Sequence, residues 1–88
     1  MNIETIKSRV IEIFEDICSE KIVNVSVNII EDLSMDSLRM VMLLVMIEDV
    51  FDLELDESDM NPFALITVQD VIDLVSKYKI GKEGEQDG

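Results

Sequence analysis

Ser37 has the clearest chemical potential in this sequence, because its hydroxyl follows Asp36 and comes just ahead of an unbroken apolar run, Met40 to Ile47. The run predicts a helix, so the hydroxyl should lie at the N-terminus of that helix, where another protein can reach it. Free amides and the helix dipole favour an anion at such a position, which suits a serine that carries a phosphodiester. A second interpretation is equally open at this point, in which Ser37 only helps to begin the helix.

The sequence argues against a catalytic use of that hydroxyl. It has no histidine, so a Ser-His-Asp arrangement is excluded, and no lysine stands near Ser37 in the sequence. The glycines all lie beyond residue 80, so there is no glycine-rich phosphate loop. An EF-hand loop starting at Asp52 would need a glycine where Glu57 stands and an acid where Phe63 stands. We therefore expect neither an enzyme nor a metal site.

Charge is the most unusual property of the whole chain. Twenty acidic residues against seven basic ones give a net charge of -13 at pH 7, which disfavours nucleic acid and anionic membranes as partners. The charge favours partners with basic surfaces, although keeping the protein soluble explains it equally well. No apolar run approaches the roughly 20 residues of a membrane span. Because Cys18 is the only cysteine and the start, Met1 to Glu4, does not look like a leader, we expect a cytoplasmic protein without an internal disulfide. We also expect a monomer.

Helices are predicted on both sides of the serine. Apolar residues recur three and four positions apart over residues 3–18, with Asn2 as N-cap and Cys18 in the buried stripe. Residues 68–79 show the same pattern behind a capping box formed by Thr67 and Asp70. Short helical turns are expected near residues 56–61 and 63–66. The chain should form one domain, residues 1–79, followed by a flexible tail, residues 80–88.

Residues 19–36 give conflicting signals. Val23, Val25, Val27 and Ile29 alternate with polar residues as in a strand. No second strand is predicted, and a lone strand cannot satisfy its backbone hydrogen bonds. We therefore expect a long ordered loop that lays its Val and Ile side chains across the helices, and loops of this length are often functional.

The helix that Ser37 begins should run to Asp52, with Asp36 as its cap. At about 100° per residue it has two apolar faces. The predicted core face consists of Met40, Leu43, Leu44, Ile47, Val50 and Phe51. The second face consists of Leu38, Val41, Met42, Val45, Glu48, Asp49 and Asp52. A domain this small cannot bury a helix on every side. We therefore interpret the second face as a docking surface. The alternative is that this face contacts the loop or the other helices.

Three segments resemble the acyl carrier protein family. The first, Asp32-Leu33-Ser34-Met35-Asp36-Ser37-Leu38, resembles the family signature Asp-Leu-Gly-x-Asp-Ser-Leu. Residues 47–51, Ile-Glu-Asp-Val-Phe, are similar to the end of the family's second helix. Residues 66–73, Ile-Thr-Val-Gln-Asp-Val-Ile-Asp, are similar to the start of its last helix. The segments follow the family's order and spacing, and the likeness covers about residues 3–79.

The resemblance implies an all-α, acyl-carrier-like bundle of three main helices plus one short helix, with a long loop between the first two. It implies a phosphopantetheine attached covalently to Ser37 by a holo-synthase, a phosphopantetheinyl transferase, which would dock on Asp36 and Leu38. Acyl intermediates would travel as thioesters between partner enzymes that contact the second helix. The docking residues expected there are Asp36, Leu38, Arg39, Val41, Met42, Val45, Glu48 and Asp49.

The sequence departs from the family pattern at positions that bear on specificity. Ser34 stands where the family has glycine, which should shift the loop geometry slightly. Arg39 and Met42 stand where carriers of bacterial fatty-acid synthesis commonly have acids. These residues make the face less acidic and more apolar, which favours partners specialised beyond housekeeping fatty-acid synthesis, such as those of a polyketide, peptide or modified-lipid pathway. The expected partners are acyl-transferring or adenylating enzymes with basic or apolar docking patches. The connector 61–65, Asn-Pro-Phe-Ala-Leu, also departs from the usual acidic one and could alter how an acyl chain enters between the helices.

The main interpretation is therefore an acyl carrier of fatty-acid or polyketide-like biosynthesis. A peptidyl or D-alanyl carrier, loaded by an adenylating enzyme, would share the fold and the arm. From another class, a helical protein-interaction module whose serine is never modified would also fit the composition.

Overall fold

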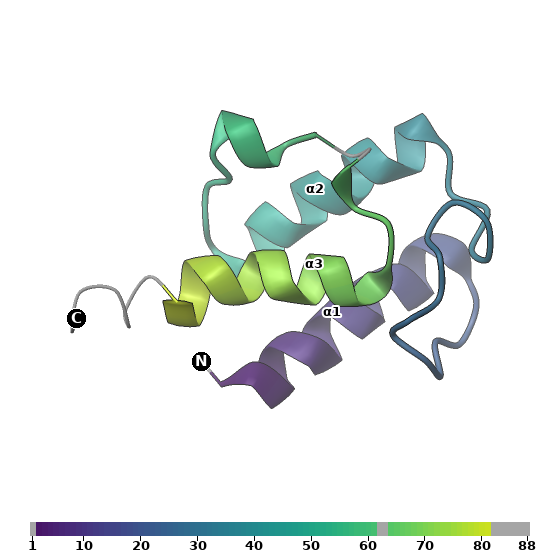
Figure 1. Cartoon of the computed structure of the whole chain (residues 1–88), viewed down its shortest axis with the longest axis horizontal. Helices are drawn as coiled ribbons and strands as arrows, with labels where there is room; N and C mark the ends of the chain where they lie inside the picture. Colours follow the sequence, from purple (N-terminus) through teal and green to yellow (C-terminus); the bar gives the residue numbers. More distant parts are fainter. Residues whose placement is uncertain (1, 62–63, 82–88) are drawn as a thin grey trace.

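The computed structural model describes residues 2–61 and 64–81. Within these residues the chain forms three α-helices, α1 (Ile3–Cys18), α2 (Ser37–Phe51) and α3 (Val68–Ser76) (Figure 1). A short 3-10 helix, η1 (Glu57–Asp59), lies between α2 and α3, and a π-helical turn, η3 (Lys77–Gly81), continues α3. The described residues contain no strand, only an isolated antiparallel bridge between Asn28 and Thr67. The predicted all-α bundle is confirmed.

The helix ends follow the predicted capping residues. The Asn2 side chain accepts a hydrogen bond from the Thr5 amide at 2.9 Å, and Thr67 and Asp70 form the predicted capping box. The last helix was predicted to reach residue 79, but α3 ends at Ser76 and its backbone widens into the π-helical turn. Residue 63, where one short turn was predicted to begin, lies outside the described residues. Residues 82–88 of the predicted tail also lie outside them.

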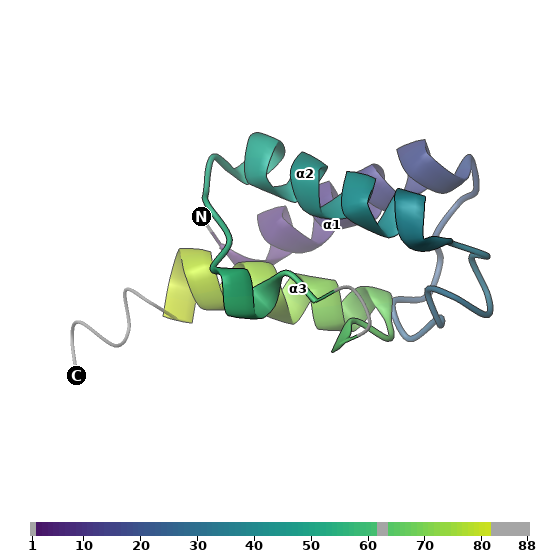
Figure 2. The same cartoon turned by 90° about the horizontal axis from the view of Figure 1, so that it is seen from above.

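The core forms where the apolar faces of the three helices meet. α1 packs against both α2 and α3, and all three helices lie along the long direction of the molecule (Figures 1 and 2). The buried residues of the helices are Ile6, Val10, Ile13 and Phe14 on α1, Met40, Leu43, Leu44, Ile47 and Phe51 on α2, and Val68, Val71, Ile72 and Val75 on α3. The core is therefore mainly aliphatic, as the composition requires.

Two residues expected in the core, Val50 and Cys18, are less buried than predicted. Val50 is 37% exposed because the buried stripe of α2 centres on Ile47 and Val50 lies at its edge. Cys18 is half-buried against the core, and burial raises the pKa of its thiol.

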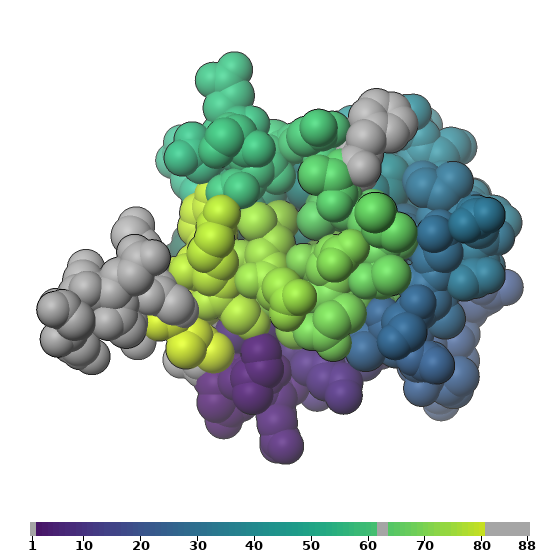
Figure 3. All heavy atoms as spheres, in the orientation of Figure 1, coloured from purple at the N-terminus to yellow at the C-terminus, as the bar shows by residue number. Residues whose placement is uncertain are grey.

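The segment between α1 and α2 is the expected ordered loop. The amide of Gln69 donates to the carbonyl of Val25 at 2.9 Å, and the amide of Ile29 donates to the carbonyl of Ile66 at 2.8 Å. The loop therefore packs directly against the start of α3 (Figure 3). Ile22, Ile29, Leu33 and Met35 are buried, whereas Val23 is 91% exposed. The segment with the strand-like alternation therefore forms no strand. It makes one isolated β-bridge, between Asn28 and Thr67 at the start of α3.

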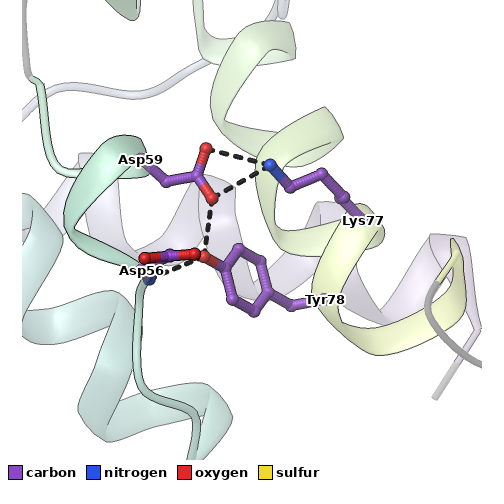
Figure 4. Close-up of polar contacts among 4 residues, drawn as sticks. All are labelled: Asp56, Asp59, Lys77 and Tyr78. Carbon is purple, nitrogen blue, oxygen red and sulfur yellow. Dashed lines mark hydrogen bonds and ion pairs between the residues drawn. The ribbon is translucent and has the colours of Figure 1, made fainter.

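A polar clasp of Asp56, Asp59, Lys77 and Tyr78 joins η1 to η3, the turn that continues α3 (Figure 4). The Tyr78 hydroxyl donates to Asp59 at 2.6 Å and accepts from the Asp56 amide at 2.7 Å, and Lys77 forms an ion pair with Asp59 at 2.9 Å. The hydrogen bonds from Tyr78 and Lys77 hold the pKa of Asp59 below its usual value. The clasp and the N-terminus of α2 lie at opposite ends of the bundle (Figures 1 and 2).

Candidate functional site

Ser37 is the first residue of α2, and it is exposed. Asp36 is the N-cap: its carboxylate accepts from the Arg39 amide at 2.9 Å, and its carbonyl accepts from the Met40 amide at 3.0 Å. The amides of Ser37 and Leu38 belong to the first turn, where helix geometry provides no internal acceptor. The site therefore combines an accessible hydroxyl with two free amides at the positive end of a helix dipole.

Buried side chains on both sides hold this exposed site in place. Leu33, Met35 and Met40 are each less than a tenth exposed, whereas Ser34, Asp36 and Ser37 face solvent. The Met35 amide donates to the carbonyl of Ile29 at 3.3 Å, which joins the approach to α2 to the loop residue already bonded to Ile66. The approach to Ser37 is thus connected by backbone hydrogen bonds to the start of α3.

Asn28 organises the turn at the beginning of this approach. Its side-chain oxygen accepts from the amides of Ile30 at 2.9 Å and Glu31 at 2.8 Å. Its own amide donates to the Asp32 carboxylate at 2.7 Å, and its carbonyl accepts from the amides of Asp32 at 2.9 Å and Leu33 at 3.2 Å. This role was not predicted from the sequence, in which Asn28 is one of several polar residues in an alternating pattern. The available signal was an Asn followed closely by an Asp, which favours side-chain-capped turns.

Ser34 has a left-handed backbone conformation, with φ of 55°. Glycine adopts this region freely, whereas a residue with a Cβ is strained there. The sequence has serine at the position where the acyl carrier signature has glycine. The serine is therefore held in a conformation that its own preferences oppose.

We expect Ser34→Gly to stabilise the fold by about 0.5–1 kcal/mol, because it relieves the strain at a positive φ by more than it loosens the unfolded chain. Urea unfolding monitored by circular dichroism measures the change. Ser34→Ala is the control, since it keeps the Cβ and should bring no gain. A Ser34→Gly variant no more stable than the wild type would show that this loop conformation carries no strain.

The second face of α2 is open to solvent over its first turns. Leu38 is 70% exposed, and Val41, Met42 and Val45 are 52%, 45% and 56% exposed. Asp36, Arg39 and Asp49 are exposed as well. An apolar stripe with this degree of exposure on a small domain is typical of an interaction surface.

The charges on this face are unevenly placed. Arg39, the only basic residue of α2, has no ion-pair partner among the described residues. Glu48 is half-buried, and its carboxylate accepts from the Leu55 amide at 2.9 Å, so this acid ties the connector to α2. The structure thus gives Glu48 a fold-stabilising contact in addition to its expected place on the docking face. Apart from Arg39, which forms no ion pair in the described part of the chain, the first turns of α2 are mainly apolar, although the chain as a whole is strongly acidic.

The structure also reports on two other classes of site. Across residues 2–61 and 64–81, no cluster of three or more His, Cys, Asp or Glu side chains is placed to hold a metal ion. None of the helices in that part of the chain is long and apolar enough to span a bilayer.

Comparison with known proteins gives two findings. The family described as "Phosphopantetheine attachment site" matches residues 8–75. The chain is also similar to a protein named acyl carrier protein from Syntrophobacter fumaroxidans (strain DSM 10017 / MPOB). The two are 33% identical over 60 residues, which cover 68% of this chain and 72% of that protein. The family match extends from α1 through Ser37 to α3.

Proposed function

Because the chain belongs to the acyl carrier protein family, which carries a covalent phosphopantetheine, we propose that Ser37 is the attachment residue. The observation that carries this proposal is the exposed Ser37 hydroxyl at the first position of α2, directly after the capping residue Asp36. A phosphodiester at this atom lies beside the free first-turn amides and the positive end of the helix dipole, which both stabilise an anion. The site fits the group.

The chain supplies the nucleophile, and the transferase supplies the base. Ser37 Oγ forms a bond to phosphorus in coenzyme A while a pyrophosphate P–O bond breaks and adenosine bisphosphate leaves. The hydroxyl proton passes to a base of the transferase. Once bound, the group provides a terminal thiol that holds acyl chains as thioesters. The chain then contributes recognition and a high effective concentration of the cargo at its partners.

We assign acyl groups as the cargo, in fatty-acid or polyketide-like biosynthesis. The similarity to a protein named acyl carrier protein supports this assignment over a peptidyl or D-alanyl carrier. The test offers the phosphopantetheinylated protein either an acyl transferase with an acyl-coenzyme A or an adenylating enzyme with an amino acid and ATP. A mass gain that hydroxylamine removes is expected in the first reaction. A gain only in the second would overturn the acyl assignment. A wild-type protein that takes up no phosphopantetheine in the first place would favour an interaction module.

The second face of α2 is the proposed docking surface for these enzymes. Its exposed apolar side chains match an apolar patch on the partner. Arg39, which has no ion pair within residues 2–61 and 64–81, matches an acidic residue beside that patch. The -13 charge of the chain favours a basic surface around that patch. Contact would then depend on apolar burial near Ser37, and the acidic remainder of the chain would mainly accelerate encounter.

We expect Met42→Glu to raise the KM of a partner enzyme about tenfold, because it places a charge in the centre of an apolar contact. The melting temperature should hardly change, since Met42 is 45% exposed in the free protein. Met60→Glu is the matched control: Met60 is 39% exposed but lies outside α2, next to η1. Equal effects of both substitutions would point to net charge instead of docking, and a large fall in melting temperature for Met42→Glu would place Met42 in the core.

A further inference from the structure

We infer that Asn28 is a positioning residue for the modification of Ser37, because its hydrogen bonds fix the loop that presents the serine. The inference rests on the proposed function of Ser37 and adds to it a residue that lies outside the serine signature. Asn28 belongs to the turn between α1 and α2, and its side chain is only partly exposed. It would act through the loop and does not need to touch the transferase.

The turn is closed from both of its ends. The Asn28 side chain satisfies the amides of Ile30 and Glu31, while the Asp32 carboxylate satisfies the amide of Asn28 in return. The Asn28 carbonyl adds bonds from the amides of Asp32 and Leu33. A turn with this many reciprocal bonds is restricted to few conformations, because amides that lose these acceptors would have to find water instead.

The position of this turn determines the position of the residues before Ser37. Ile29, the next residue, is fully buried, and its carbonyl accepts from the amide of Met35 at 3.3 Å. Its amide donates to Ile66 at 2.8 Å, so the turn is also fixed relative to α3. Met35 is 2% exposed and stands next to the capping residue Asp36. A displacement of the turn would therefore reach the N-terminus of α2.

The strained backbone at Ser34 has to be held in place by the hydrogen bonds of the neighbouring residues. Ser34 has a φ of 55°, which serine does not favour by itself. The residues on either side hold it there: the Leu33 amide donates to the backbone carbonyl of Asn28, and the Met35 amide donates to the backbone carbonyl of Ile29. The Asn28 side chain in turn fixes that backbone through the amides of Ile30 and Glu31. Removing the Asn28 side chain should let the loop populate other conformations in which Ser34 is relaxed. A transferase that binds only the native loop would then show a higher apparent KM, since its affinity falls with the competent fraction.

The experiment compares Asn28→Ala with Asn24→Ala. Asn24 belongs to the same loop, and its side-chain oxygen accepts from the Ser26 amide at 2.8 Å, so it caps a similar turn farther from Ser37. Initial rates of phosphopantetheine transfer from coenzyme A by a promiscuous holo-synthase are followed by intact mass. For Asn28→Ala we expect KM to rise about five- to tenfold with kcat unchanged, and for Asn24→Ala we expect a change below about twofold.

Two further measurements separate positioning from general stability. Amide hydrogen exchange at Leu33 and Met35 should increase in Asn28→Ala, while the amides of α1 stay protected. Asn28→Ser keeps a shorter oxygen acceptor for the turn and should show a smaller rise in KM than Asn28→Ala. If Asn28→Ala does not fold, the Asn28→Ser variant decides instead: its KM should be higher than that of the wild type, with kcat unchanged.

The inference is overturned if the wild type is modified and KM is unchanged in the Asn28 variants. It is also overturned if Asn24→Ala raises KM as much as Asn28→Ala does. A wild-type protein that is not modified at Ser37 would instead overturn the proposed function itself, so the two failures are distinguishable.

Discussion

Ser37→Ala is expected to abolish phosphopantetheine attachment completely, because the substitution removes the only oxygen that the proposed reaction uses. The fold should be unaffected, since Ser37 is exposed, its helix is capped by Asp36, and alanine is a good helix former. Incubation with coenzyme A and a holo-synthase should therefore add the mass of one phosphopantetheine to the wild type and nothing to Ser37→Ala.

Ser34→Ala is the matched control for this loss. Ser34 is also exposed and lies in the same loop, so a transferase that modifies any accessible serine near α2 could use either hydroxyl. The Ser34→Ala variant should gain the full mass. A gain that persists in Ser37→Ala would contradict the assignment of the arm to Ser37.

The second large effect is expected in the core. Leu43→Ala and Ile47→Ala should each cost about 2–5 kcal/mol of unfolding free energy, because both side chains are fully buried and their truncation leaves a cavity between the helices. The loss is large for a domain whose total stability is of the order of 5–15 kcal/mol. Urea denaturation monitored by circular dichroism would measure it.

Val45→Ala tests whether the two faces of α2 are correctly assigned. Val45 lies on the same helix but is 56% exposed, so its truncation should change stability by less than about 0.5 kcal/mol. A Val45→Ala variant that loses more stability than Leu43→Ala would mean that the two faces are reversed.

Local patterns predicted most of the helical fold. The caps Asn2, Asp36 and Thr67 act on amides within three residues, so their effect is visible in a short stretch of sequence. Helical periodicity likewise identified the buried faces, except for residues such as Val50 at the edge of a stripe. The family signature depended on the same kind of short-range pattern, which is why the candidate serine could be named from the sequence.

Contacts between distant segments were not predictable in this way. Two contacts depend on how the connector folds back: the hydrogen bond that Tyr78 donates to Asp59, and the one that the Leu55 amide donates to the Glu48 carboxylate. In the sequence, nothing distinguishes Glu48 from the other acidic residues that are expected on the surface. The role of Asn28 depends on the bridge to Thr67, which brings the loop to the start of α3. Ser34 shows the same limit, since its left-handed conformation follows from the hydrogen bonds of its neighbours and not from its own preference.

The most direct test of the account is to locate the arm on the wild-type protein by fragment mass analysis after modification by a holo-synthase. The account predicts that the whole phosphopantetheine mass lies on the fragment that contains Ser37, and that fragmentation assigns it to Ser37 itself. An arm found on Ser34 or on any other residue, or a protein that takes up no arm at all, would contradict it.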